Sequence, residues 1–282
     1  MLHTIISTNV VNDEEKIKEL LIVFKKAVVL WWKELMKYFD FLVKDWWNDE
    51  LLNIREEAEK RSGKIIMEII QWSNFFSILD IKTEKHRKDT KISENSKYSL
   101  IVDSLDWRNN FRLWIPNFSV SIAMLKGSEI ILWVVYNPIM DILFFAEKWK
   151  WAYKNWKKIM VNNQSKISES TISYLHEYRS VPQTVKHNIL WDFIKINLKR
   201  FLVERSPAND FCLLADWKIE WIICNQESIY DFCAWKLIAK EAWALITNLK
   251  DNNLDTNNFF VISNSSQEIN KQLYDIFSEN VW

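Results

Sequence analysis

The sequence predicts an α+β fold, in which helices and strands are mixed without a strict strand–helix alternation. Three observations indicate this class. Apolar residues recur at helical spacing near the N-terminus, apolar runs of strand length fill the middle of the chain, and both patterns are interspersed towards the C-terminus. Such an order is typical of folds in which helices and sheets form layers around a shared core.

The first half of the chain is predicted to start with helices and to continue with strands. A helix is expected over residues 13–43, where Asn12 or Asp13 can cap the first turn, and a second from about 51 to 70. The polar stretch 82–97 is expected to be a mobile loop. The expected strands are 75–80, 99–103, 118–125, 129–136 and 141–147.

The second half is predicted to alternate helices with single strands. Pro182 is suited to the first position of a helix over 182–197. The other expected elements are a helix over 206–215, a strand over 219–224, a helix over 231–246, a strand over 259–262 and a helix over 267–277. No repeat or long linker divides the chain, so a single domain over 1–282 is expected, with an N-terminal half (1–160) and a C-terminal half (161–282).

Composition argues against several classes of partner. The 37 basic and 37 acidic residues balance, so no overall field attracts nucleic acid or a membrane surface. Three cysteines without C-x-x-C spacing indicate reduced thiols in a cytoplasmic protein, not a disulfide framework. Neither a secretory signal nor an apolar run of about 18 residues is found.

The balance of tryptophan and glycine is unusual. The chain has 17 Trp and 2 Gly, whereas average usage of about 7% would give roughly 20 Gly. One hypothesis is that many Trp positions carry glycine in the living cell, through a UGA codon that some bacterial lineages read as glycine. The alternative is an aromatic-rich ligand-binding protein. Binding rings should gather on one face, whereas displaced glycines should fall at turns, hairpin tips and helix ends.

The positions of the tryptophans favour the glycine hypothesis. Asn155-Trp156 stands where Asn-Gly would close a hairpin within 148–158, and Trp217 follows a helical pattern where a glycine C-cap belongs. The pairs Trp31-Trp32 and Trp46-Trp47 are unusual as packed rings and ordinary as Gly-Gly.

Residues 103–111 (DSLDWRNNF) place two carboxylates three residues apart at the end of an expected strand. Asp103 and Asp106, with the backbone carbonyl of Leu105 between them, offer the hard oxygen ligands that Mg²⁺ prefers. Such a site needs a small residue at position 107, because the backbone must turn sharply beside the ion. A turn with two capping aspartates is the alternative interpretation.

With Trp read as Gly, the motif at 103–111 resembles the D-P-(I/L)-D-G-(T/S)-x-N-F signature of the inositol monophosphatase family. Residues 115–123 (IPNFSVSIA), 133–138 (WVVYNP) and 149–156 (WKWAYKNW) resemble its I-P-x-F-x-V-S-I-A, G-V-V-Y-x-P and G-x-G-A-x-x-N-G motifs. Residues 230–243 resemble the family's W-D-x-A-A-G … E-A-G-G.

The resemblance implies a layered αβαβα sandwich of the inositol monophosphatase and fructose-bisphosphatase type, a Mg²⁺ cofactor, a small phosphorylated metabolite as substrate, and a homodimer. It also implies the site. The implied metal ligands are Asp103, Leu105, Asp106 and Asp231, the implied catalytic residues are Asp103, Asp106 and Arg108, and the implied substrate-binding residues are Trp107, Arg108, Asn109, Arg205, Ser206 and Asp231.

The chain departs from the family pattern at several positions. Arg108 replaces the Thr or Ser that positions the attacking water, and Cys224 stands where animal inositol phosphatases place a substrate-contacting Glu. Asp80 and Glu84 lie near the place of the family's G-E-E ligand without matching it, and Glu57 is an approximate counterpart of the T-x-x-D acid. Two functions therefore stay open: a Mg²⁺-dependent phosphatase for a sugar, polyol or nucleotide phosphate, and a catalytically weakened relative that binds a phosphometabolite.

Overall fold

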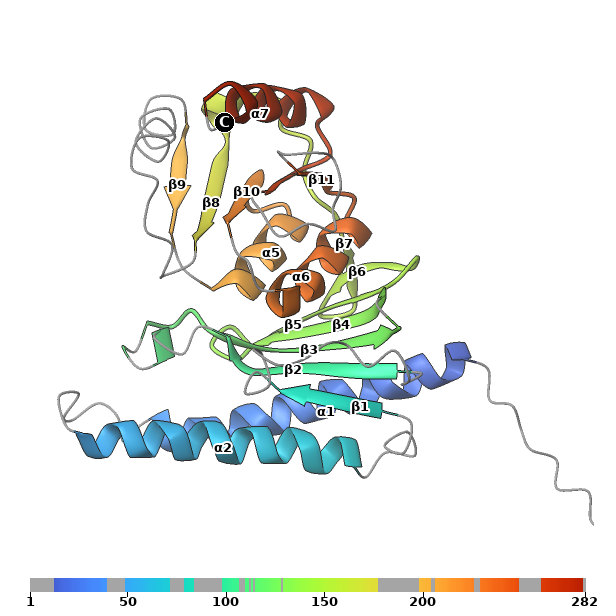
Figure 1. Ribbon diagram of the computed structural model, residues 1–282, viewed down its shortest axis with the longest axis vertical. Coiled ribbons are helices and arrows are strands. Elements are labelled where there is room, and N and C mark those ends of the chain that lie inside the picture. Colours follow the sequence, from blue (N-terminus) through green and yellow to red (C-terminus); the bar gives the residue numbers. More distant parts are fainter. Residues whose placement is uncertain are drawn as a thin grey trace, which may run out of the picture.

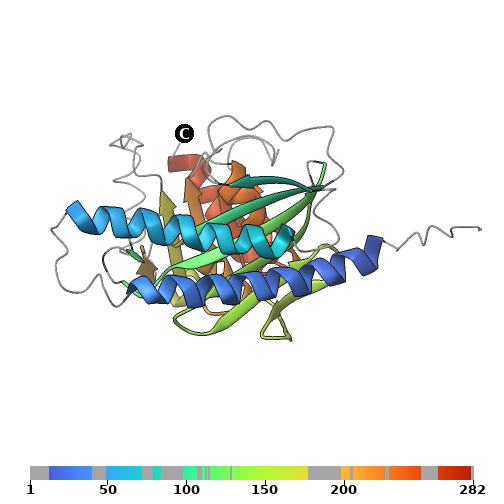
Figure 2. The same cartoon turned by 90° about the horizontal axis from the view of Figure 1, so that it is seen from below.

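A computed structural model describes residues 13–39, 49–71, 79–83, 98–106, 110–111, 113, 115–127, 129–176, 198–203, 206–225, 229–248 and 260–280. Five layers follow one another in space, which confirms the predicted αβαβα sandwich (Figure 1). Two long helices form the first layer, α1 (Asp13–Phe39) and α2 (Asp49–Gln71). They lie side by side across one face of the first sheet (Figure 2).

The second layer is a seven-stranded sheet whose strands are neighbours both in space and along the chain. Its first two strands are parallel, and every later pair is antiparallel. The strands are β1 (Leu79–Thr83), β2 (Tyr98–Asp106), β3 (Ser119–Lys126), β4 (Glu129–Asn137), β5 (Ile142–Glu147), β6 (Trp151–Lys154) and β7 (Lys157–Ile159).

The third layer consists of α5 (Pro207–Ala215) and α6 (Ile229–Glu241), which pack between the two sheets. The fourth is a five-stranded sheet with the order β11 (Leu245–Asn248), β12 (Phe260–Ser263), β10 (Trp221–Asn225), β8 (Thr171–His176) and β9 (Arg200–Leu202). Helix α7 (Gln267–Asn280) covers its outer face, and a short 3₁₀ helix, η3 (Ile167–Glu169), precedes β8.

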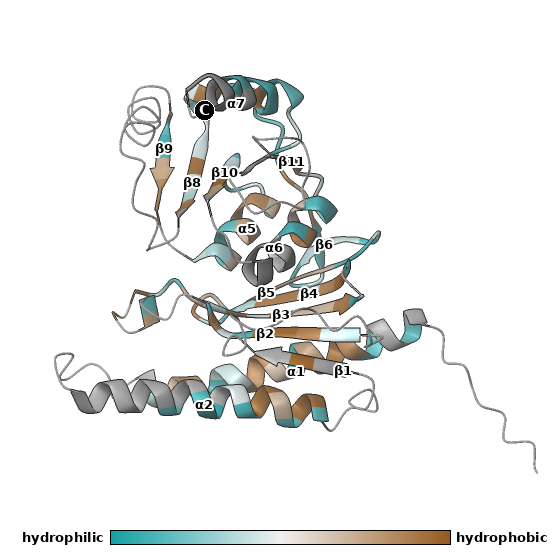
Figure 3. Ribbon diagram, viewed as in Figure 1, coloured by the Kyte–Doolittle hydropathy of each residue, from teal (hydrophilic) through white to brown (hydrophobic). Residues whose placement is uncertain are grey.

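Two apolar cores explain why the middle strands read as continuous apolar runs. Along β4, Leu132 and Val134 pack under α1 and α2, whereas Trp133 and Val135 face the core shared with α5 and α6. Successive strand residues point to opposite faces, so a sheet covered on both sides needs apolar residues at every position. Figure 3 shows this concentration of apolar residues in the middle strands of the sheet, β3 and β4.

Several predicted boundaries need correction. The helix expected to reach residue 246 ends at Glu241, and 245–248 form β11 instead. The strand expected over 75–80 is described as β1 over Leu79–Thr83, so residues 82–83 belong to a strand and not to the polar loop. Strands β8 and β9 were not predicted. The helix expected over 182–197 lies outside the described residues.

Tryptophan occupies most of the left-handed backbone positions. Among the described residues, seven non-glycine residues have positive φ, and five of these are tryptophans. An L-residue in this region brings its Cβ close to the backbone carbonyl, which costs about 1–2 kcal/mol and makes glycine the usual occupant. The five are Trp149 (φ 67°), Trp151 (φ 112°), Trp156 (φ 72°), Trp217 (φ 57°) and Trp243 (φ 73°).

Two of these tryptophans end helices in the same way. After α5, the Trp217 N–H donates to the Leu214 carbonyl at 3.1 Å and the Lys218 N–H donates to that of Leu213 at 2.9 Å. After α6, the N–H groups of Trp243 and Ala244 make the equivalent bonds at 2.9 Å each. This pair of bonds defines a Schellman motif, in which the left-handed residue is usually glycine. The physical reason that α6 ends before residue 246 is this motif.

The hairpin tips show the same preference. Asn155 (φ 42°) and Trp156 form the two-residue turn between β6 and β7, and positive φ at both positions is the type I′ geometry for which Asn-Gly is preferred. In the turn between β5 and β6, the N–H groups of Trp149 and Trp151 donate to the Glu241 carboxylate at 2.8 and 3.1 Å. The predicted hairpin over 148–158 is therefore confirmed.

Other tryptophans do not follow the expectation for displaced glycines. Trp31, Trp133 and Trp221 are fully buried inside a helix or a strand. None of their three indole N–H groups finds a hydrogen-bond partner within the part of the chain that the structure describes, although buried indoles usually do. Trp46, Trp47 and Trp107 lie outside the described residues.

We expect Trp217→Gly to be more stable than Trp217→Ala by about 1 kcal/mol, because alanine retains a Cβ that is unfavourable in the left-handed region. Both variants lose the same indole ring, including its contact with the Lys218 amine, so their difference reports the backbone alone. Urea unfolding followed by circular dichroism measures it.

The matched control is the pair Lys64→Gly and Lys64→Ala on the exposed side of α2. Glycine should be the less stable of that pair by about 1 kcal/mol, as in any helix interior. If Trp217→Ala had a higher free energy of unfolding than Trp217→Gly, the positive φ assigned to position 217 would be contradicted.

Candidate active site

The two aspartates of the predicted metal motif lie at an irregularity in β2. Asp103 is paired with Ser121 of β3 and Asp106 with Ser119, so three steps along β2 match two steps along β3. In a regular strand, residues three apart point to opposite faces. The extra residue forms a β-bulge, which restores a common face for Asp103 and Asp106.

Burial of the neighbouring residues supports this assignment. Leu100, Val102 and Leu105 all belong to the core beneath α1 and α2. Without the bulge, Leu105 would point to the opposite face from Leu100 and Val102. The bulge thus keeps Leu105 in the core and leaves Asp106 facing the helical layer of α5 and α6.

Asp106 is nearly buried, with 5% of its surface exposed, and one of its oxygens is held by three donors. Its Oδ2 accepts hydrogen bonds from Ser206 Oγ at 2.9 Å, the Ala208 N–H at 3.2 Å and Ser119 Oγ at 3.3 Å. Because a buried carboxylate is costly unless hydrogen-bonded, these donors are what allows the charge to lie here. The partial positive charge at the N-terminus of α5 adds to the attraction.

Asp103 is only partly buried, and its Oδ1 accepts the backbone N–H of Leu105 at 3.1 Å. This short turn fixes the carboxylate beside the bulge. It also bears on the alternative of two capping aspartates: Asp103 does cap its own turn, but Asp106 reaches a helix that lies 100 residues further along the chain. A purely local turn does not account for Asp106.

The structure brings only part of the predicted site together. Asp103, Leu105 and Asp106 lie on β2, and Ser206 at the start of α5 contacts Asp106 directly. Asp231 belongs to the first turn of α6, but its side chain lies outside the described residues. The remaining predicted residues also lie outside them: Trp107, Arg108, Asn109 and Arg205.

Sequence reasoning missed two polar residues of the site, Ser119 and Asn209. Ser119 lies directly across from Asp106 on β3, so the strand pattern of 118–125 could have pointed to it once the register was known. Asn209 bonds to Ser206 and not to Asp106. Nothing in the local sequence indicates that contact.

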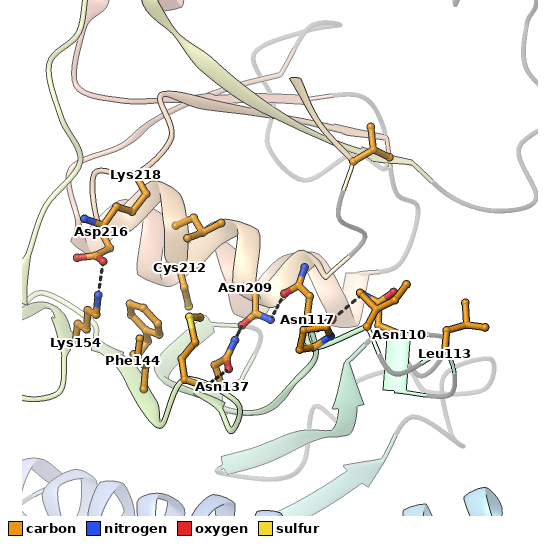
Figure 4. Close-up of a pocket in the computed structure, with 16 residues that line it drawn as sticks. Asn110, Leu113, Asn117, Asn137, Phe144, Lys154, Asn209, Cys212, Asp216 and Lys218 are labelled. Atoms are coloured by element: carbon orange, nitrogen blue, oxygen red, sulfur yellow. Dashed lines mark hydrogen bonds and ion pairs between the residues drawn. The ribbon is translucent and has the colours of Figure 1, made fainter. Parts of the chain in front are cut away.

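A cavity of about 1030 Å³ is lined by residues such as Asn209 and Cys212 of α5, and neither Asp103 nor Asp106 lines it (Figure 4). Asn110, Asn117, Asn137 and Asn209 form a hydrogen-bonded group along one part of its wall. An ion pair between the Lys154 Nζ and Asp216 Oδ2, at 2.6 Å, lies at another part. Apolar side chains from β5 and α5, among others, complete the lining.

The donor types present suit a hard divalent cation. Asp103, Asp106 and the carbonyl of Leu105 supply oxygen only, and the fixed Asp106 carboxylate is the kind of ligand that Mg²⁺ takes. Burial, reinforced by the charge of Asp106, raises the pKa of the Cys212 thiol well above its ordinary value, so this neighbour is a neutral thiol and not a soft thiolate ligand. Within the described residues no group of three acidic, His or Cys side chains gathers, so these ligands fit a metal only together with a further group such as Asp231.

No helix in the described ranges is long and apolar enough to cross a membrane.

Comparisons with known proteins show which family the chain belongs to. The profile of the "Inositol monophosphatase family" matches residues 31–281. An "Inositol monophosphatase" of Dictyostelium discoideum is 26% identical over 196 residues, which cover 67% of this chain and 70% of that protein. A "Fructose-1,6-bisphosphatase/inositol-1-monophosphatase" of Aquifex aeolicus is 27% identical over 243 residues, which cover 83% and 87%.

Solved structures share the fold. The inositol monophosphatase from Anabaena superposes with a TM-score of 0.77 at 21% identity, covering 95% of this chain and 100% of that chain. A 2′AMP-bound SaIMPase-II superposes with a TM-score of 0.74 at 16% identity, covering 94% and 95%. The family profile covers most of the chain and includes the bulged D-x-x-D strand and the N-terminus of α5. The chain therefore belongs to the inositol monophosphatase family.

Proposed function

We propose that this chain is a Mg²⁺-dependent phosphomonoesterase that hydrolyses a small sugar, polyol or nucleotide phosphate. The observation that carries the proposal is the buried Asp106 carboxylate. It accepts hydrogen bonds from the N-terminus of α5 and lies on the same strand as Asp103. A carboxylate pair fixed in this way is suited to bind cations and is a poor choice for a purely structural position. Family membership supports the reaction class.

Asp103, Asp106, Asp231 and the carbonyl of Leu105 would hold the metal. Bound Mg²⁺ would neutralise phosphate charge and lower the pKa of a water that attacks the ester. The chain's own part is to orient these oxygens: Ser119, Ser206 and the Ala208 N–H fix Asp106, and the Leu105 N–H fixes Asp103.

Of the two acids that could add a ligand, Glu84 is the better candidate. Asp80 of β1 is paired with Ser99, four residues before Asp103 along β2, which is about 13 Å of strand. Thr83 is paired with Val102, and Glu84 is the next residue in the sequence. We therefore propose Glu84 and not Asp80 as the additional acidic ligand.

The names of related proteins support the range of substrates proposed. One relative is named a fructose-1,6-bisphosphatase/inositol-1-monophosphatase, and one structural neighbour holds 2′AMP.

The proposed partners are a small phosphorylated metabolite and a second copy of the chain. Exposed apolar side chains that line the cavity, including Leu113, Ile115 and Met140, support such a contact between two copies. Light scattering in solution would detect the dimer.

A second part of the proposal is that glycine, and not tryptophan, stands at many Trp positions in the living cell. The five left-handed tryptophans support it, whereas Trp31, Trp133 and Trp221 lie buried inside a helix or a strand and do not. The codons test it directly. UGA at positions 149, 156, 217 and 243, with peptide masses that show glycine there, is the expected result; UGG codons at these positions would reject it.

The function is tested by Asp106→Asn, in protein carrying the residues that its own host inserts. We expect the wild type to release phosphate from at least one member of a panel of sugar, polyol and nucleotide phosphates, with saturable Mg²⁺ dependence. The variant should lose turnover by more than roughly 100-fold, because even outer partners of a metal site contribute about 10- to 100-fold.

The matched control is Asp141→Asn. Asp141 is exposed and accepts a hydrogen bond from the Tyr136 hydroxyl at 2.7 Å, which asparagine can also accept. Its turnover should equal that of the wild type. A wild type that binds phosphometabolites without turning any over would favour the catalytically weakened relative.

Arg108 is proposed to contact a second anionic group of the substrate, since a guanidinium beside metal-bound phosphate oxygens suits bidentate anion binding. Arg108→Thr should then raise KM and lower kcat/KM. A rise in kcat with unchanged KM would show instead that the position serves to orient the attacking water.

A further inference from the structure

The buried amide of Asn209 connects the site to the surrounding scaffold. Asn209 is 4% exposed and lies at the third position of α5. Its Nδ2 donates to Ser206 Oγ at 2.9 Å and to Asn117 Oδ1 at 2.7 Å, and its Oδ1 accepts from Asn137 Nδ2 at 3.2 Å. Both the NH₂ group and the oxygen of the Asn209 amide are therefore hydrogen-bonded.

The orientation of this amide follows from its neighbours. Asn137 Oδ1 accepts the Met140 N–H at 3.1 Å, so the other end of the Asn137 amide, its NH₂ group, faces Asn209. The atom of Asn209 that meets this donor must be its oxygen. Its NH₂ group is thereby directed to Ser206 and Asn117.

That direction decides what the Ser206 hydroxyl does. A hydroxyl carries one proton, and when it accepts a hydrogen bond its own proton must go elsewhere. Ser206 is fully buried, and its Oγ accepts from Asn209 and donates to Asp106 Oδ2. An N-cap serine usually accepts a backbone N–H of its own helix; within the described residues Ser206 makes no such bond.

We propose that Asn209 is a positioning residue of the metal site: by donating to Ser206 it directs the serine hydroxyl onto Asp106, and so holds that carboxylate in its metal-binding orientation. The inference rests on the proposed function. Asn117 lies just before β3 and Asn137 is the last residue of β4, so their hydrogen bonds to the Asn209 amide join the seven-stranded sheet to α5.

The test measures the binding of Mn²⁺, used as a spectroscopic probe for Mg²⁺, by electron paramagnetic resonance in the full-length protein. Asn209→Asp keeps the shape but replaces the donor with an acceptor, and Asn209→Leu removes all three hydrogen bonds. Each should raise the Kd for Mn²⁺ about tenfold. If the leucine variant fails to fold, the aspartate variant still gives the answer.

A double-mutant cycle shows whether Asn209 acts through Ser206. Ser206→Ala should itself weaken Mn²⁺ binding about tenfold. In that background Asn209→Leu should add little, because the hydroxyl that it directs is gone. Full additivity, about a hundredfold in the double variant, would overturn the proposal, as would an unchanged Kd in the single Asn209 variants.

The matched control is Asn264→Leu. Asn264 is also fully buried, and it donates to Asn162 Oδ1 and the Gln164 carbonyl and accepts the Ser266 N–H. We expect it to lower stability like Asn209→Leu while leaving the Kd for Mn²⁺ unchanged. If Asn209→Leu and Asn264→Leu both raised the Kd for Mn²⁺ in proportion to their loss of stability, Asn209 would have only a structural role. A wild type without saturable Mn²⁺ binding would overturn the proposed function and this inference together.

Discussion

The arrangement of the site depends on one long-range interaction, between the Asp106 carboxylate of β2 and the N-terminus of α5. A buried negative charge needs donors, and a helix N-terminus has N–H groups without intrahelical partners. Each group supplies what the other lacks. The contact joins the seven-stranded sheet to the helical layer, and the β-bulge in β2 is what turns Asp106 towards it. The same geometry that stabilises the junction also fixes the orientation of the Asp106 carboxylate, which we propose as a metal ligand.

The turns depend on a second constraint, which is backbone conformation. Two Schellman motifs and a two-residue hairpin require positive φ at Trp217, Trp243 and Trp156. Only glycine adopts that region without steric cost. The geometry of these turns therefore favours a residue that the printed sequence does not show. A protein made with tryptophan would carry backbone strain at each of these three positions, and one made with glycine would not.

The site combines family features with features of this chain. The carboxylate pair on β2 resembles the family signature, and the N-terminus of α5 donates to Asp106. Behind Ser206, Asn209 is hydrogen-bonded to Ser206, Asn117 and Asn137. It connects the cavity wall to Asp106 through Ser206, so changes in the cavity wall and changes at Asp106 are expected to be energetically coupled.

The sequence by itself determined the elements whose signals are local. Apolar periodicity located α1 and α2, apolar runs located β3 to β5, and the D-x-x-D motif located the carboxylates. Tertiary structure decided the rest. A residue three positions from Asp103 faces the same way only because β3 pairs with β2 across a bulge. Ser206 donates to Asp106 and accepts from Asn209 only because the fold brings these residues together. Partners that lie 100 residues apart in the chain leave no periodic trace in the sequence, since only folding brings them within hydrogen-bond distance.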